Sequence, residues 1–238
     1  MGALIWDDTG KKYFESGVDH GVIYPVVTTG SGTSATTGYG TGVVWNGLTA
    51  VTESPSGAEP TDLWADNIKY ATLRSAEDFG MTIEAYTYPD EFAVCDGSVQ
   101  PVTGVTIGQQ ARGVFGFSYR TYVGDDVSGN QGHYKLHLVY GCTASPSERA
   151  YSTINDSPDA ITFSWEITTV PVNVTNYKPT ACITIDSRTA NETNLKALEK
   201  ILYGVNASTG VEESDPELPT PDEVIAIITS GTRIPTTD

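Results

Sequence analysis

Two histidines come closest to the spacing of a metal site. His133 and His137 lie four positions apart, and on a helix both imidazoles could bind one zinc ion. The segment 134–140 instead alternates polar and apolar residues, which predicts a strand and separates the two positions by about 13 Å. We therefore expect both histidines to line one face of a strand with Lys135, and we expect no metal site.

The residues just before these histidines partly match a calcium-binding loop. Asp125, Asp126 and Asn130 could supply oxygen ligands, but Gln131 stands where such a loop needs glycine and His137 where it needs glutamate. We interpret the segment as a solvated hairpin tip.

Sequence patterns for catalysis are missing elsewhere. The sequence has neither a Gly-x-Ser-x-Gly elbow for a nucleophilic serine nor a Gly-x4-Gly-Lys loop for phosphate. With 30 Asp and Glu residues, some pair of carboxylates will be close in any fold, so their number does not indicate a glycosidase. We expect neither enzymatic activity nor a cofactor.

The composition excludes further classes of protein. The 13 Lys and Arg residues against 30 Asp and Glu give a formal charge of −17, so we expect no basic surface that binds nucleic-acid phosphates. Apolar residues make up 39% of the chain, yet no stretch approaches the roughly 20 apolar residues of a membrane span. Cys95, Cys142 and Cys182 form no CxxC pair, and we expect them to be small buried side chains in a protein made in a reducing cytoplasm.

Strands dominate the predicted secondary structure. Apolar and polar residues alternate most strictly in 161–167 and 134–140, the pattern of half-buried strands. Six further segments complete a set of about eight strands: 21–27, 42–52, 67–73, 82–86, 114–122 and 180–186.

Two helices are predicted near the C-terminus. The capping-box pattern of Thr189 and Glu192 opens an apolar stripe that ends at Gly204. A second capping box, Thr220 with Glu223, opens a shorter apolar run. The sequence therefore predicts a mainly β fold with one flanking helix and a short C-terminal helix.

Two long segments are predicted to be loops. Residues 29–42 are almost wholly Thr, Gly and Ser, and residues 53–66 contain two prolines and four acids. Loops of this length are often functional.

Several blocks of the sequence resemble one protein family. The matching blocks are 44–48, 52–59, 65–70, 83–92, 135–141, 144–148, 155–158, 197–204 and 218–225. In these blocks the chain is similar to the major tail protein of long-tailed, non-contractile bacteriophages. The resemblance extends over 17–228, except for 29–42, and the chain after Ser230 falls outside it.

This resemblance implies a structural virion protein. Its fold would be the tail-tube fold, a β-sandwich or split barrel, in one domain over 1–238. Hexameric rings would stack into a tube that conducts DNA without binding it specifically. The partners would be further copies of the chain and the tail-tip, tape-measure and tail-terminator proteins, with no membrane binding. Assembly would take place in the bacterial host cytoplasm, and the protein would end in the virion tail.

The resemblance also suggests which segments make contacts between rings. The loop 53–66 would reach the adjacent ring, and an N-terminal arm (1–16) and a C-terminal arm (211–238) are secondary candidates. The loop residues expected in the contact are Glu53, Pro55, Glu59, Pro60, Leu63, Trp64 and Asp66. Those of the N-terminal arm are Leu4, Ile5 and Trp6. The alternative is a compact loop packed on its own subunit.

An acidic lumen would let DNA slide. Six copies of −17 give −102 formal charges per ring, and such a surface repels phosphate. Glu84 and Glu166 are candidates for the lumen because each lies on the polar side of an alternating strand. The alternative is that they face the outer solvent.

A second function remains open at this point. A soluble β-sandwich binding module, either carbohydrate-binding or a virion decoration protein, would also suit a mainly β chain. It would be a monomer or a small closed oligomer with aromatic side chains exposed on one face.

Overall fold

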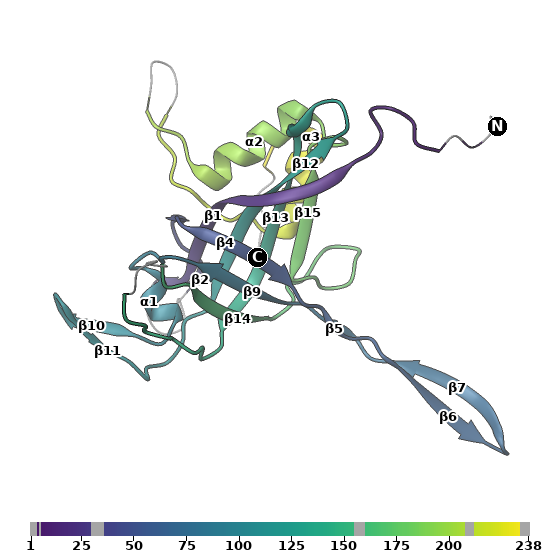
Figure 1. Ribbon diagram of the computed structural model, residues 1–238, viewed down its shortest axis with the longest axis horizontal. Coiled ribbons are helices and arrows are strands. Elements are labelled where there is room, and N and C mark those ends of the chain that lie inside the picture. The colour runs from purple at the N-terminus through teal and green to yellow at the C-terminus, as the bar shows by residue number, and fades with distance from the viewer. Residues whose placement is uncertain (1–3, 5, 30–35, 155–159, 208–211, 234–238) are drawn as a thin grey trace.

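The protein is described by a computed structural model that covers residues 4, 6–29, 36–154, 160–207 and 212–233. Its centre is an antiparallel sheet of nine strands (Figure 1). The strands are β1 (Phe14–Thr29), β2 (Thr36–Tyr39), β3 (Val43–Trp45), β4 (Leu48–Glu53), β9 (Gly80–Ala85), β12 (Phe115–Asp125), β13 (Gly129–Ala144), β14 (Phe163–Thr169) and β15 (Cys182–Asp186). Their order is β2-β1-β12-β13-β14-β9-β4, with β3 on β1 and β15 on β13.

The sheet changes direction along β13. Residues 135–139 pair with β15, whereas residues 142–144 pair with β14. Gly141 lies between these two sections with φ +60°, and a Cβ there would be 2.3 Å from the carbonyl oxygen of Val170. Only glycine fits this conformation and close approach. The bend lets the β14-β9-β4 section cross the β1-β12-β13 section.

One hydrophobic core fills the space between the two sections. Trp45, Trp165, Phe92 and Phe117 lie at its centre with ring centroids 4.5–5.7 Å apart, mostly edge to face. The predicted alternation in 161–167 is confirmed for Trp165 and Ile167, which are buried. Edge-to-face packing of this kind adds to the burial of apolar area.

A second core lies on the other face of the β1-β12-β13-β15 section, beneath α2 (Glu192–Tyr203) and α3 (Pro221–Ser230). Leu195, Leu198 and Leu202 of α2 pack there, as the apolar stripe predicted. Figure 1 shows both helices together on one side of the sheet.

One of the two predicted helix N-caps is confirmed and the other is wrong. The capping box of Thr220 and Glu223 is confirmed, with both reciprocal hydrogen bonds present. The prediction of Thr189 as the N-cap of α2 is wrong, because Asn191 accepts from the backbone N–H groups of Thr193 and Asn194 instead. Thr189 belongs to the turn that follows β15 and donates to the carbonyl of Asp186.

The mainly β class is confirmed, but the strand count and the closure differ from expectation. The sheet is not a closed barrel, since β2 and β4 end it. Beyond its nine strands there are three two-stranded pairs: β5 (Ser56–Gly57) with β8 (Glu77–Asp78), β6 (Pro60–Ala65) with β7 (Ile68–Arg74), and β10 (Val99–Val102) with β11 (Val105–Ile107). Of these strands only β7 was predicted, as the segment 67–73. The others are mostly exposed, so no alternation of burial marked them in the sequence.

Two segments predicted as loops contain strands. Residues 53–66 are not irregular, because β5 and β6 pair with β8 and β7 in one long hairpin. Pro60 argued against a strand here, because proline cannot donate a backbone hydrogen bond. A proline is nevertheless tolerated at the first residue of an exposed strand. In the segment 29–42, β2 pairs with the end of β1.

The remaining helix, α1 (Phe92–Cys95), is a single short turn that buries Phe92 and Cys95. Cys95 and Cys142 are buried and Cys182 is half-buried, all as free thiols. Within the described residues, every helix is too short or too polar to cross a membrane.

Candidate assembly surfaces

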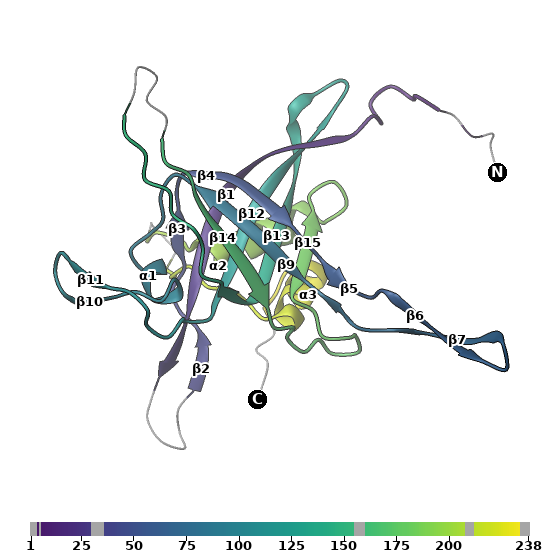
Figure 2. The same ribbon diagram turned by 60° about the horizontal axis from the view of Figure 1, so that its bottom comes forward.

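The most prominent surface feature is the hairpin of residues 54–79, which we call the arm. It projects from the body on the side away from α1 (Figures 1 and 2). Its tip is the two-residue turn Asp66-Asn67, with φ +51° and +61°. Positive φ at both positions belongs to a type I′ turn, whose twist matches that of a hairpin.

The register of the arm gives it one apolar face. Leu63 lies opposite Ala71, and Ala65 lies opposite Ile68. Because alternate residues share a face, these four side chains and Leu73 form one apolar stripe. Leu63, Ile68 and Leu73 are 42%, 63% and 56% exposed.

The opposite face of the arm is mainly polar. The Lys69 ammonium lies 2.7 Å from the Asp62 carboxylate, which also accepts a 2.8 Å hydrogen bond from Thr72. These contacts hold the pKa of Asp62 below its ordinary value. Trp64 is on this side and is 68% exposed.

The apolar stripe of the arm is largely exposed to solvent. An isolated two-stranded hairpin is marginally stable in water, and no described element covers the stripe. The seven residues predicted for the ring contact lie along the arm, from Glu53 at the root to Asp66 at the tip, and all of them are exposed. The strand predicted at 67–73 is confirmed as β7, but Ile68 and Leu73 were not among the residues expected in the ring contact, so the stripe was only partly predicted.

A partly buried polar cluster fixes the root of the arm to the body. The Tyr119 hydroxyl donates a 2.6 Å hydrogen bond to Oε1 of Glu53, the last residue of β4. The His137 ring stacks on Tyr119 with centroids 4.5 Å apart, and its Nδ1 lies 3.4 Å from the same oxygen. Thr121 and Thr184 hydroxyls hydrogen-bond the two ring nitrogens of His137.

The position of His137 in this cluster determines its burial and its charge state. His133, Lys135 and His137 alternate along β13 on one face, as predicted, but His137 is only 7% exposed whereas His133 is exposed. The strand prediction itself is confirmed, since both lie on β13. Burial lowers the pKa of His137, so the ring is neutral at pH 7.

The hairpin tip near Asp125 has the expected form. Oδ1 of Asp125 accepts from the backbone N–H groups of Val127 and Ser128, which closes the turn between β12 and β13. These hydrogen bonds lower the pKa of Asp125. Within the described ranges, His, Cys, Asp and Glu form no group of three that could hold a metal ion.

A second candidate surface is the outer face of the β14-β9-β4 section. Glu84 pairs with Ser164 and Glu166 pairs with Thr82, while the residues between them point into the core. Both glutamates therefore lie on one polar face. That this face lines a lumen remains a prediction.

No family model and no curated protein matches this chain. The assignment of a function therefore depends on the residues and surfaces themselves.

The two terminal segments differ in their contact with the body. Leu4 and Trp6 are 78% and 76% exposed, and Ile5 lies outside the described residues. The described part of the C-terminal segment, 212–233, packs on the body instead of projecting. There Leu218 enters the second core, and Arg233 makes two 2.7 Å hydrogen bonds to Glu217.

A cleft of about 620 Å³ lies between the arm root and the polar face. Its described lining includes Asp78, Thr82 and Glu166, but no histidine, cysteine or lysine.

Proposed function

We propose that this protein is a tail-tube subunit of a long-tailed, non-contractile phage. Copies would form hexameric rings that stack into a hollow tube, assembled in the host cytoplasm and carried in the virion. The arm is the observation that carries the proposal, because its apolar stripe is exposed in the single chain and requires another surface to cover it. The sequence blocks that resemble the major tail protein support the same assignment.

The edges of the β14-β9-β4 section support ring formation. β4 ends the sheet, and β14 pairs with β13 only through residues 167–169. The carbonyl of Glu166 accepts from the backbone N–H of Ser145, so the section has a free edge at β4 and another along residues 163–165 of β14. Unpaired edges favour pairing with another chain. Head-to-tail pairing of the two edges would join six sections into one continuous sheet around a lumen.

In that arrangement the polar face carrying Glu84 and Glu166 would line the lumen. Carboxylates there would repel phosphate, so DNA would pass without the salt-dependent binding that lysine and arginine produce. The subunit would be structural, without catalysis or a cofactor. Tail-tip, tape-measure and terminator proteins would bind the tube at its ends and in its lumen.

The exposed aromatics give no support to the binding-module alternative. A carbohydrate platform requires aromatic side chains gathered on one face. Trp64 and Tyr70 share the arm, but the other most exposed aromatic residues lie on separate segments: Trp6, Tyr86, Tyr151 and Tyr177.

Electron microscopy and light scattering of the purified, concentrated protein test the proposal. We expect tubes, or six-fold rings with a central hole. A variant with residues 59–75 replaced by a short Gly-Ser turn keeps the β5–β8 pair and should fold without forming tubes. A full-length chain that stays a 25.4 kDa monomer even with purified tail-tip complex would contradict the tube function. Normal tubes from the shortened variant would contradict the role of the arm.

A further inference from the structure

The chain that leaves β13 stays close to the unpaired edge of β14. β13 ends at Ala144, and the backbone N–H of Ser145 still donates a 2.7 Å hydrogen bond to the carbonyl of Glu166. Beyond Ser145, no described residue continues this backbone pairing. We call the next six residues, 146–151, the strap.

Arg149 attaches the strap to the start of β14. Its guanidinium carbon lies over two aromatic rings, 5.6 Å from the ring centroid of Phe163 and 5.4 Å from that of Tyr88. Nη1 of Arg149 also donates a 3.3 Å hydrogen bond to the Tyr88 hydroxyl. Stacking of a guanidinium on aromatic faces is favourable, and Phe163 is the first residue of β14.

A carboxylate at the end of α1 holds the same guanidinium. Asp96 directly follows α1, and its side chain is only 8% exposed. It accepts a hydrogen bond from Nη2 of Arg149 and a 3.4 Å hydrogen bond from Arg112. Charge-assisted hydrogen bonds of this kind are stronger than neutral ones. Arg149 thus joins the strap to α1 and to β14 at once.

These contacts place the strap along the edge of the sheet. Ser145 contacts one end of the unpaired edge of β14, and Arg149 contacts the other. Residues 146–148, between these two contacts, therefore run alongside residues 164 and 165. Figure 2 shows this part of the chain passing between α1 and β14. Covering a strand edge with a loop prevents it from pairing with another chain.

The attachment of the strap is local. Among the described residues, the strap makes no backbone hydrogen bond to β14, and Glu148, Ala150 and Tyr151 are exposed. Segments with few backbone hydrogen bonds and few buried contacts open far more readily than core strands. A strand from another chain would supply the backbone hydrogen bonds that residues 163–165 lack.

We propose that the strap, held by Arg149, covers the β14 edge in the free subunit and is displaced when β4 of a second copy pairs there. This inference rests on the proposed assembly into rings and assigns its regulation to one segment. Only subunits with an open strap can pair, so the strap raises the concentration at which assembly begins. It would keep newly made subunits from associating before the tail is built.

Chymotrypsin cleavage of the single chain provides the first test. Tyr151 in the strap and Tyr177 in the loop before β15 are both 74% exposed, so cleavage after Tyr177 is an internal control. Arg149→Gln should speed cleavage after Tyr151 about fivefold, because cleavage follows the population of the open strap. Cleavage after Tyr177 should not change. Circular dichroism checks that the variant is folded.

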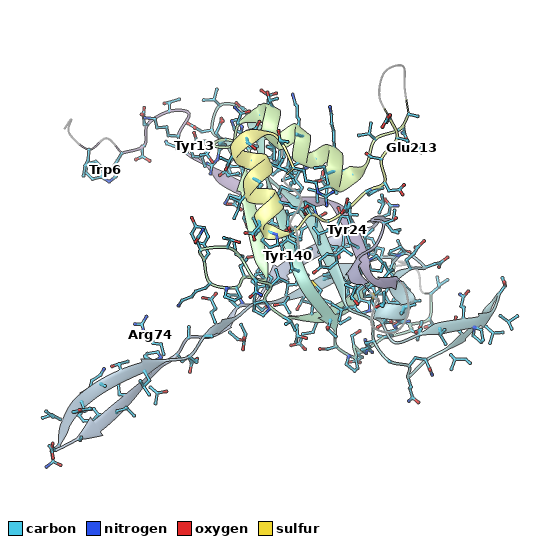
Figure 3. All side chains as sticks on the ribbon, turned by 180° about the vertical axis from the view of Figure 1, so that it is seen from behind. Trp6, Tyr13, Tyr24, Arg74, Tyr140 and Glu213 are labelled. Atoms are coloured by element: carbon cyan, nitrogen blue, oxygen red, sulfur yellow. The ribbon has the colours of Figure 1, made fainter. Side chains whose placement is uncertain are left out.

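Arg188→Gln is the matched control variant. The Arg188 guanidinium also lies over an aromatic ring, 4.5 Å from the centroid of Tyr13, and pairs with Asp186. Figure 3 shows Tyr13 at the end of the molecule opposite the β10–β11 hairpin and α1. Both cleavage rates should match those of the parent. Unchanged cleavage after Tyr151 in Arg149→Gln would overturn the proposal, whether or not the protein forms tubes.

The concentration needed for tube formation provides the second test. Arg149→Gln should lower it about five- to tenfold, as measured by light scattering and electron microscopy. Arg149→Lys keeps the charge but loses the planar group that stacks on two rings, and should give a smaller decrease. Loss of a purely structural contact would leave this concentration unchanged or raise it. Faster cleavage without a lower concentration for assembly would therefore overturn the regulatory role of the strap.

Discussion

Tyr119 and Glu53 join two elements that are 66 residues apart in the chain, through a 2.6 Å hydrogen bond from a hydroxyl to a carboxylate. Glu53 is the last residue before the arm, and Tyr119 lies in the middle of the central strand β12. The direction in which the arm leaves the body therefore depends on a contact with the core. Burial and the nearby carboxylate both raise the pKa of Tyr119, so it stays a donor over the whole physiological range.

Removing this hydroxyl should loosen the arm without unfolding the subunit. Tyr119→Phe should lower the free energy of unfolding by about 1 kcal/mol, since the partly exposed Glu53 can be rehydrated. It should also speed amide exchange at Ser54 and reduce tube formation. The measurements are urea denaturation, hydrogen exchange and electron microscopy.

Tyr134→Phe is the matched control for that variant. Tyr134 donates a 2.8 Å hydrogen bond to Glu199 on α2, remote from the arm. We expect a similar loss of stability with unchanged exchange at the arm root and unchanged assembly. Equal effects of both variants on assembly would indicate that Tyr119 acts through general stability alone.

Acid should destabilise the fold through His137. Burial lowers its pKa below the ordinary 6.5, partly offset by Glu53 and Glu15, while Lys135 lowers it further. The unfolded chain therefore binds more protons than the folded chain between the two pKa values. Stability should fall as the pH decreases below about 6.5 and level off once the folded histidine is also protonated.

Denaturation curves at several pH values check this dependence. His137→Gln should show a smaller loss of stability between neutral pH and the acid side than the parent chain. His133→Gln replaces an exposed histidine on the same strand and should retain the slope of the parent. An unchanged slope in His137→Gln would assign the pH dependence to another group.

The bend of β13 should be intolerant of any side chain at Gly141. Gly141→Ala combines a positive φ with a Cβ only 2.3 Å from a carbonyl oxygen, so we expect a loss well above 2 kcal/mol or insoluble protein. Gly129→Ala shares a positive φ of +65° but has no atom within 4 Å of its Cβ. It should cost only about 1–2 kcal/mol. Thermal melts of both variants measure the difference, and equal losses would exclude the clash as its cause.

Reversing charge on the polar sheet face should make assembled tubes retain DNA. Glu84→Lys with Glu166→Lys should leave folding intact, because both side chains lie outside the core, and should produce DNA binding that weakens as salt rises. The control is Glu192→Lys, an 81% exposed position on α2 beyond the opposite face of the sheet. Filter binding at 50 and 200 mM salt compares them. DNA binding by the control alone would contradict a lumenal position for the polar face.

Local patterns in the sequence predicted the elements whose formation depends on residues close together in the chain. Alternation in 134–140 gives a strand because Leu136, Leu138 and Tyr140 share the face that meets the core beneath α2 and α3. The capping box of Thr220 and Glu223 forms because its hydrogen bonds span only three residues. The apolar stripe of α2 was readable for the same reason. The sequence did not show that Asn191, and not Thr189, is the N-cap of α2. Thr189 lies in the turn after β15, where its hydroxyl donates to the carbonyl of Asp186.

Tertiary structure decided the features on which assembly depends. The strand β6 was invisible in the sequence because its stability comes from pairing with β7 and not from a buried face of its own. The burial of His137 follows from the approach of Glu53, 84 residues away, which no local pattern encodes. The position of the arm on the side away from α1 likewise arises only when β1, α1 and the β14-β9-β4 section meet, because long-range strand pairing sets where each element lies (Figure 2).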